Sequence, residues 1–263
     1  EHAPQALLLN MVAPLGVTTR LFAENTEAPV LGVCELPFVT RVKWEGEKLG
    51  QLHYAGLNHL GWFWGEKDSL DAGIEQGEIA EEILQRYGAA PLHYFYRVFE
   101  VEIGKRLGFA ANPDRALELM DLGDSIFEQM RSHPGSDIPD FDQRPTPWFD
   151  QALSPVLSAM LGTDSWTGTV NLPNKGHLKE VGDGVVVEVA ANLAQGDVDV
   201  LPCPPPPPKV SEFLEAIGHF DDLLYHACSE RKPALIKEAL RYLPLPLQAS
   251  DLDAISDAVR APV

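Results

Sequence analysis

The sequence predicts an α+β fold that begins with one β-α-β step of a parallel sheet. Two short apolar stretches, residues 6–10 and 29–34, are typical of buried strands, and residues 17–24 between them favour a short helix. Farther along, residues 167–172 and 184–191 are rich in β-branched side chains, which favour strands. Because amphipathic helical stretches follow these strands, we expect helices and strands to share one core.

The first half of the chain is predicted to continue with strands and then helices. Residues 41–64 alternate well enough for strands, and 42–46 and 50–54 are the clearest stretches. Residues 78–87 carry apolar side chains at helical spacing. Gly88 follows directly, as glycine often does at the end of a helix.

Helices dominate the second half. Asn112 and Pro113 form an N-cap followed by a first-turn proline, which predicts a helix as far as about residue 130. Residues 148–161 predict a helix that Pro155 interrupts. Three amphipathic stretches predict the C-terminal helices, at residues 211–228, 233–243 and 250–261.

Composition excludes several classes of partner. The 263 residues include 20 Lys and Arg against 39 Asp and Glu, so the formal net charge is −19. Such a surface repels nucleic-acid phosphates and anionic lipid, and we expect neither nucleic acid nor membrane as a partner. No apolar run approaches the roughly 20 residues of a membrane helix. Three widely spaced cysteines argue against a disulfide framework and favour a reducing compartment, the cytoplasm.

Two residues stand out as candidate metal ligands. Cys34 ends a predicted buried strand, and His59 lies in Gly56-Leu57-Asn58-His59-Leu60. A thiolate and an imidazole both suit a borderline divalent metal such as zinc or manganese. Their wide separation fits no local metal-binding loop, so a shared site would have to form through the tertiary fold. On their own, single Cys and His residues are more often packed structurally.

Six stretches carry a family resemblance. The two around the candidate ligands read Gly32-Val33-Cys34-Glu35-Leu36-Pro37 and Gly56-Leu57-Asn58-His59-Leu60. The others are a turn at residues 9–16, a proline before a tyrosine-rich run at 91–96, a helical stretch at 114–120, and Val170-Asn171-Leu172-Pro173-Asn174-Lys175-Gly176 followed by Val187-Glu188-Val189. In this order, they resemble the NAD- and manganese-dependent family-four glycosidases of the 6-phospho-β-glucosidase type.

The resemblance implies a fold and a domain division. It covers residues from about Leu8 to Pro244 and corresponds to the C-terminal part of that family. We therefore expect an α+β domain similar to the C-terminal domain of lactate dehydrogenase at residues 41–263. Residues 1–40 would be the last strands of a Rossmann nucleotide-binding domain. Strands left at the edge of such a remnant would be exposed, so we expect a homodimer or higher oligomer, as the resemblance also implies.

The resemblance also implies a chemistry. Cys34 and His59 would hold a manganese ion, while NAD oxidises the sugar 3-hydroxyl and a tyrosine removes the proton at carbon 2. Tyr94 matches the catalytic tyrosine best and Tyr96 is second. The substrate would be a phosphorylated sugar glycoside, and its contacts would come from three residues: Arg115, Asn58 and Glu35.

Three departures from the family pattern bear on activity. Glu35 stands where the family has an asparagine that touches sugar and metal, and Ala13 stands where the family has a substrate-contacting asparagine. The sequence also has no Gly-x-Gly-x-x-Gly dinucleotide fingerprint. We therefore expect that this chain alone does not hold NAD and is inactive alone.

Three functional hypotheses remain open from the sequence. The first is a glycoside hydrolase that uses the NAD redox-elimination mechanism with a divalent metal, whose nucleotide-binding half lies outside this chain. Cys34, His59 and Tyr94 favour it. The second is a non-catalytic relative that acts as a binding or assembly module, which Ala13 and the missing fingerprint favour. A relative of lactate or malate dehydrogenase is a weaker third, because the Arg and His pair for a carboxylate substrate is missing.

Overall fold

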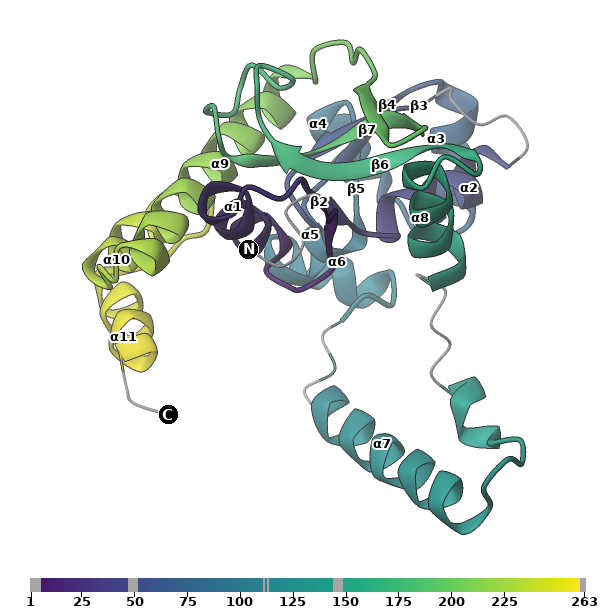
Figure 1. Ribbon diagram of the computed structural model, residues 1–263. Helices are drawn as coiled ribbons and strands as arrows, with labels where there is room; N and C mark the ends of the chain where they lie inside the picture. The colour runs from purple at the N-terminus through teal and green to yellow at the C-terminus, as the bar shows by residue number, and fades with distance from the viewer. Residues whose placement is uncertain (1–5, 47–51, 111, 113, 144–148, 261–263) are drawn as a thin grey trace.

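A single mixed β-sheet runs through the protein in a computed structural model that describes residues 6–46, 52–110, 112, 114–143 and 149–260 (Figure 1). Among these residues the strand order is β1-β2-β6-β7-β3-β4-β5, and β8 pairs with β7. Helices cover both faces of the sheet and also extend beyond it. The α+β prediction is confirmed, with parallel and antiparallel pairs in one sheet.

The N-terminal β-α-β step is also confirmed. β1 (Leu8–Asn10) and β2 (Val30–Val33) pair in parallel, and α1 (Leu15–Asn25) connects them. The other edge of β2 pairs antiparallel with β6 (Ser165–Pro173), where Gly32 lies opposite Asn171. The expectation that β2 has an exposed edge is therefore wrong, because a strand from far along the chain covers it.

The centre of the sheet is a long antiparallel pair. β6 and β7 (Val186–Ala194) pair along their whole length, and β8 (Asp197–Val200) turns back on β7. β3 (Leu52–Gly56) pairs with β7 on one side and with β4 (Trp62–Gly65) on the other. The short β5 (Ala90–Pro91) completes the order. This arrangement brings the end of β2 and the β3–β4 turn to the same region.

One predicted strand is a helix. Residues 42–46 belong to the end of α2 (Leu36–Glu45), which has Pro37 in its first turn and Gly46 at its C-cap. Trp44 on this helix is 4% exposed and packs its ring edge-on against Phe63 at 5.2 Å. Burial of that face outweighs the strand preference of the β-branched residues, a preference that context readily overrides. The proline and the glycine were the helix signals in the sequence.

Short helices fill the space between β4 and the long C-terminal helix. They are α3 (Lys67–Glu75), α4 (Glu81–Tyr87), α5 (His93–Val98) and α6 (Val101–Arg106). α4 ends at Gly88, which has the left-handed conformation expected from the sequence. An aromatic cluster of Trp62, Phe95 and Phe213 joins the sheet, α5 and α9 in the largest core.

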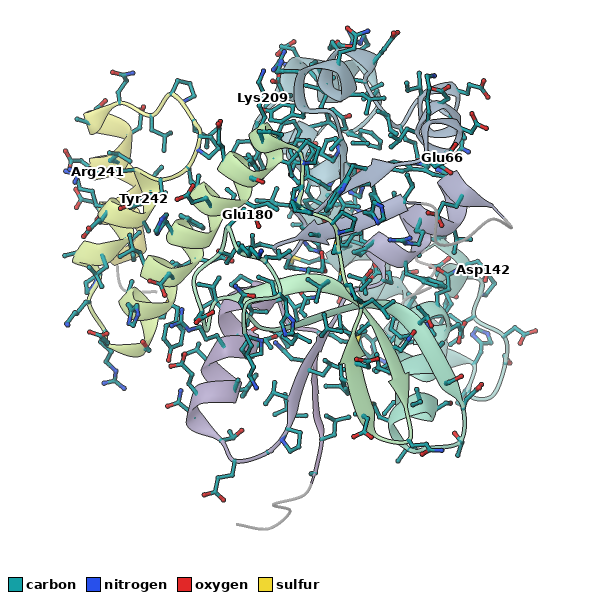
Figure 2. The ribbon with its side chains drawn as sticks, turned by 90° about the horizontal axis from the view of Figure 1, so that it is seen from above. Glu66, Asp142, Glu180, Lys209, Arg241 and Tyr242 are labelled. Carbon is teal, nitrogen blue, oxygen red and sulfur yellow. The ribbon has the colours of Figure 1, made fainter. Side chains whose placement is uncertain are left out.

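The C-terminal helices confirm the amphipathic predictions. α9 (Pro208–Ser229) packs along α1, α10 (Ala234–Leu240) packs against α9, and α11 (Ala249–Arg260) follows. Figure 2 shows Tyr242 after α10, where its ring packs against His219 of α9 at 4.9 Å. No helix of the described residues has the length and apolar character needed to cross a membrane.

One segment extends away from the body. α7 (Arg115–Ser132) and the 3-10 turn Pro139–Gln143 stand apart from the sheet in Figure 1. No residue of α7 is buried. The chain returns to the sheet through a π-helical turn (Phe149–Leu153) and α8 (Ser154–Met160), where Pro155 lies in the first turn.

Candidate functional site

Four segments meet around a cavity of about 340 Å³, and one of them contributes Phe149 of the π-helical turn. Met11 and Ala13 come from the turn after β1, Cys34 and Glu35 follow the end of β2, and Asn58 and His59 lie between β3 and β4. In α/β sheets, ligands bind beyond the carboxyl ends of parallel strands, and β1 and β2 end here. The structure thus brings four of the predicted site residues to one cavity.

Cys34 is a buried thiol among acidic groups. It is 6% exposed, and its Sγ lies 4.0 Å from Oε2 of Glu35. Burial raises the pKa of the Cys34 thiol far above its ordinary value, and the nearby charge of Glu188 raises it further. The thiol therefore stays protonated unless a cation beside it favours the thiolate.

Glu188 is a site residue that the sequence reasoning missed as such. It lies on β7, is fully buried, and receives hydrogen bonds from the Tyr54 hydroxyl and from Nδ2 of Asn171, the latter at 2.9 Å. Burial raises the pKa of its carboxyl group. The signal was a single acidic residue inside a β-branched strand, where a charge has to find polar partners.

Asn58 lies between these groups. Its side chain approaches both Cys34 and Glu188, but its buried Nδ2 makes no hydrogen bond of normal geometry with any residue that the structure describes. A buried amide donor without a partner is costly. The Asn58 amide is therefore a hydrogen-bond donor that a ligand in the cavity could satisfy.

His59 adopts an unusual backbone conformation and stacks on Tyr94. Its φ is 65°, in the left-handed region that few non-glycine residues occupy. The two rings stack at 4.3 Å, and the Arg97 guanidinium lies 4.9 Å from the Tyr94 ring. Burial, followed by the charge of Arg97, lowers the pKa of His59 and favours the neutral imidazole that metals bind.

Tyr94, Tyr96 and Arg115 are not among the residues that line this cavity, and Tyr94 is next to it only through its stack on His59. Tyr96 is 0% exposed, its hydroxyl accepts a hydrogen bond from the backbone N–H of Ala80, and burial raises its pKa to about 12. It is a core residue. Arg115 begins the exposed helix α7 and pairs with Glu118. It does not line the cavity, and α7 extends away from the sheet in Figure 1.

The donor chemistry fits a divalent metal in part. Cys34 and His59 line one cavity with Glu35, and their sulfur and nitrogen atoms are donors of the kind that a borderline divalent metal binds. No group of three or more His, Cys, Asp or Glu suited to a metal occurs among the described residues. Two protein ligands leave the remaining positions to water or substrate oxygens. For NAD, the sequence offers no Gly-x-Gly-x-x-Gly fingerprint.

Two solved structures show the same fold. The 6-phospho-beta glucosidase from Thermotoga maritima, solved with manganese, NAD+ and glucose-6-phosphate, aligns with 95% of this chain and 64% of its own, at a TM-score of 0.75 and 20% identity. A 6-phospho-alpha-glucosidase from gut microorganisms was solved with NAD and glucose-6-phosphate. It aligns with 95% of this chain and 65% of its own, at a TM-score of 0.76 and 15% identity. This chain thus spans less than two thirds of either relative.

The sequence itself carries a family signature. The family model described as the family 4 glycosyl hydrolase C-terminal domain matches residues 54–245, which is most of the chain. A comparison with curated protein sequences finds no match. The family model, the fold and the ordered motifs agree, and the chain therefore belongs to the family 4 glycosyl hydrolases, of which it carries the C-terminal domain.

Proposed function

We propose that the Cys34–His59 cavity binds one manganese ion and a phosphorylated glucoside, and that the chain is the metal- and sugar-binding part of a 6-phospho-glucosidase-type enzyme. The observation that carries this proposal is the convergence of Cys34, Glu35, Asn58 and His59 on one cavity. The relatives were solved with NAD and glucose-6-phosphate, and one of them also with manganese, which supports the ligand classes.

Each residue has a role that follows from its environment. Cys34 and His59 hold the ion, and a bound cation offsets the cost of ionising a buried thiol next to Glu188. Asn58 lines the same cavity, and its Nδ2, which has no hydrogen bond of normal geometry among the described residues, would donate to a sugar hydroxyl. Tyr94, fixed against the His59 ring, is the base that removes a proton from the sugar. When bound, the metal would supply Lewis acidity beside the sugar.

In this proposal, the nucleotide binds to residues outside this sequence. The β-α-β step of β1, α1 and β2 would be the last part of a Rossmann sheet, with the division near residue 40. The free edge of β1 has no partner strand among the described residues, which leaves room for further parallel strands.

A non-catalytic binding role is the second candidate, and Ala13 favours it. Ala13 lines the cavity at the position where the family has a substrate-contacting asparagine. A methyl group offers no hydrogen bond, so a sugar would bind here with one contact fewer. Glu35 adds a negative charge that opposes an anionic sugar phosphate.

Manganese binding tests the site directly. Free Mn²⁺ gives an electron paramagnetic resonance signal that weakens on binding, so titration of the purified chain measures affinity without any activity. We expect Cys34→Ser to weaken binding at least about tenfold, whereas Cys228→Ser on the exposed end of α9 changes nothing. Equal affinity in both variants would exclude Cys34 as a ligand.

Activity separates the two candidates. Aryl 6-phospho-β-glucoside hydrolysis is measured with NAD and Mn²⁺, for this chain and for Ala13→Asn. The enzyme hypothesis expects no turnover by this chain alone and turnover once a Rossmann domain is joined before β1. If the joined protein binds Mn²⁺ and glucose 6-phosphate but stays inactive even with Ala13→Asn, the binding role holds instead.

We further propose that the protein is a homodimer or higher oligomer that contacts its copy through α7. Leu117, Met120, Phe127 and Met130 on this helix are 46–66% exposed. They repeat at helical spacing, so they form one apolar face. An exposed apolar face on a projecting helix is typical of a protein–protein contact.

A further inference from the structure

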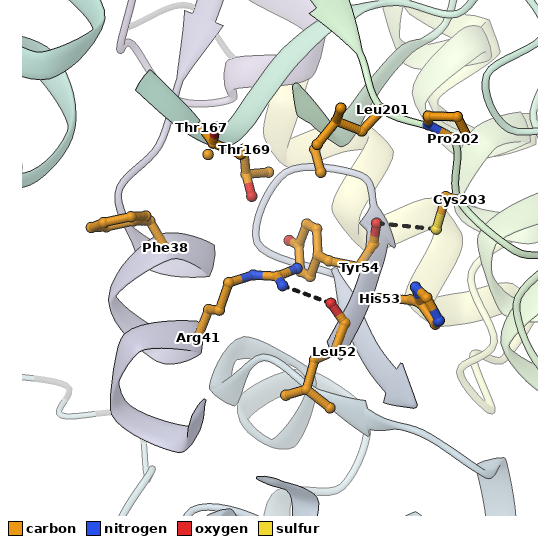
Figure 3. A pocket seen from close by; sticks show the side chains of 12 residues that line it. Phe38, Arg41, Leu52, His53, Tyr54, Thr167, Thr169, Leu201, Pro202 and Cys203 are labelled. Carbon is orange, nitrogen blue, oxygen red and sulfur yellow. Dashed lines mark hydrogen bonds between the residues drawn. The ribbon is translucent and has the colours of Figure 1, made fainter. Parts of the chain in front are cut away.

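A second cavity, of about 490 Å³, lies between α2, β3 and the β6–β7 pair. It shares no described lining residue with the Cys34 cavity. Figure 3 shows the Arg41 side chain extending from α2 toward Tyr54 and Leu52, with Phe38 on the same helix and Leu201 across the cavity. The volume is in the range of small-molecule sites, about 300–1,000 Å³.

Arg41 is the one arginine or lysine that lines this cavity among the described residues. Its side chain is 15% exposed. It donates two hydrogen bonds, to the carbonyl oxygen of Leu52 at 2.6 Å and to Oε1 of Glu45 at 3.3 Å, and both use Nη1. Within the described part of the chain, Nε and Nη2 have no hydrogen-bond partner. The edge of the guanidinium that binds carboxylates with two parallel hydrogen bonds is therefore free.

A threonine hydroxyl completes the polar side of the cavity. Thr169 on β6 is 2% exposed, and Figure 3 shows its hydroxyl directed toward Arg41. No residue in the described ranges makes a hydrogen bond with this hydroxyl. The neighbouring Thr167 hydroxyl, in contrast, already donates to Asn192 at 2.6 Å. A buried hydroxyl that faces a cavity calls for a ligand atom or a water.

The rest of the lining is mostly apolar. It includes side chains from α2, from β3 and from the segment after β8: Phe38, Leu52, Leu201 and Pro202. A small inorganic anion bound to Arg41 would leave these apolar side chains without contacts. A doubly charged phosphate would also exceed the one positive charge of Arg41, which Glu45 already offsets in part.

We propose that this cavity binds a small organic carboxylate. Nε and Nη2 of Arg41 hold the carboxylate, the Thr169 hydroxyl donates a third hydrogen bond, and an apolar body packs against Phe38 and Leu201. This site is separate from the Cys34 cavity and does not depend on the proposed glycosidase function.

The probe for this site is benzoate, with benzamide as its neutral analogue of the same shape. Backbone amide chemical shifts of the intact chain report occupancy, with Gly168 and Cys203 in the lining and Gly123 on α7 as a distant control. We expect benzoate to shift the lining signals saturably, with a dissociation constant of about 1 mM or below. Benzamide should bind at least about tenfold more weakly, because it carries no charge for Arg41.

Two variants test the assigned contacts without emptying the core. Arg41→Lys keeps a cation beside Glu45 and Leu52 but lacks the forked edge, and we expect at least about tenfold weaker benzoate binding. Thr169→Val keeps the shape and removes the hydroxyl, and binding should weaken several-fold. Arg106→Lys, on the exposed helix α6, is the matched control and should bind like the wild type.

The outcomes separate this site from the metal site. Benzoate binding should persist in Cys34→Ser and in the presence of glucose 6-phosphate. The proposal is overturned if benzamide binds as tightly as benzoate, if Arg41→Lys binds like Arg106→Lys, or if the lining signals do not respond at about 10 mM benzoate. Loss of Mn²⁺ binding, in contrast, would concern only the Cys34 cavity.

Discussion

At the scale of single residues, the site is built on buried polar groups with few charge partners. Glu188 makes no ion pair within the described ranges; it accepts hydrogen bonds from the Tyr54 hydroxyl and the Asn171 amide, and Asn58 lies close to it. Its carboxylate and the nearby Glu35 surround Cys34 with negative potential. Such an arrangement is costly in an empty protein and is relieved by a cation, which is the physical reason to expect a metal here.

The Tyr54 hydroxyl can be removed without changing the ring. In Tyr54→Phe, the packing on Phe63 at 4.6 Å remains, but Glu188 loses a donor. We expect the free energy of unfolding in urea to fall by about 1–3 kcal/mol, the cost of an unsatisfied buried polar group. Tyr94→Phe, which keeps the stack on His59, should change it by less than about 0.5 kcal/mol. Equal losses would contradict the role of Glu188.

His93 should make stability depend on pH. Burial, followed by the charge of Arg97, lowers the pKa of His93 from the ordinary value of 6.5 to about 4. The unfolded chain therefore binds the proton more readily than the folded one, so this contribution is complete above pH 6.5 and is lost as the pH falls toward 4. Melting temperatures between pH 4 and 7.5 measure it.

In His93→Gln, which cannot take up a proton, the melting temperature should fall less between pH 6.5 and 4 than in the wild type. His133→Gln, on the exposed segment after α7, is the control and should keep the wild-type slope. A His93→Gln slope that matches the wild type would show that another group titrates.

At the scale of elements, α2 ends at a glycine cap and is held against β3 by an arginine. Gly46 closes this helix with φ 57° and ψ −126°, a conformation that is essentially restricted to glycine. From the same helix, Arg41 reaches Leu52 on β3 and fixes the helix against the strand. A change at the cap therefore acts on the second cavity as well.

Gly46→Ala should destabilise the protein through the backbone alone. No atom of the described residues lies within 4 Å of the added methyl group, so steric overlap does not contribute. We expect a loss of about 1–3 kcal/mol in the free energy of unfolding. Gly123→Ala is the matched control, since that glycine is helical with open space around it and should gain about 0.5–1 kcal/mol. A gain at both positions would contradict the argument.

At the scale of the whole molecule, the sheet and α7 differ in how much apolar surface they expose to solvent. The sheet buries its aromatic residues, whereas α7 exposes an apolar face beyond the body. A helix with a solvated apolar face gains stability chiefly by packing on something else. The helix also carries Arg115, the candidate phosphate ligand, which does not line the cavity of its own chain.

The oligomer proposal predicts that charge on this face separates the copies. Light scattering of the wild type should give a mass at least twice that of one 28.9 kDa chain. Met120→Glu combined with Phe127→Glu should give the monomer mass, because two carboxylates would have to be desolvated in the contact. Ser132→Glu, exposed at the end of the same helix, should leave the mass unchanged. A monomeric wild type at high concentration would contradict the proposal.

Local pattern determined most elements and the family. Gly88 ended α4 as expected, and the β-α-β step and the C-terminal helices followed from apolar spacing. The motifs around Cys34 and His59 also sufficed to identify the family, because motif order is a property of the sequence itself. The strand predicted at residues 42–46 was wrong, since so short an alternation of apolar and polar side chains fits either a strand or one face of a helix.

Only the tertiary structure decided which residues share a site. Tyr94 and Tyr96 are two positions apart on α5, and a helix turns about 200° over two residues, so packing alone determines that Tyr96 enters the core and Tyr94 meets His59. The pairing of β2 with β6 and the position of Glu188 behind Cys34 depend on contacts between distant segments. Sequence fixes the chemistry available at each position, but long-range burial selects which groups act together.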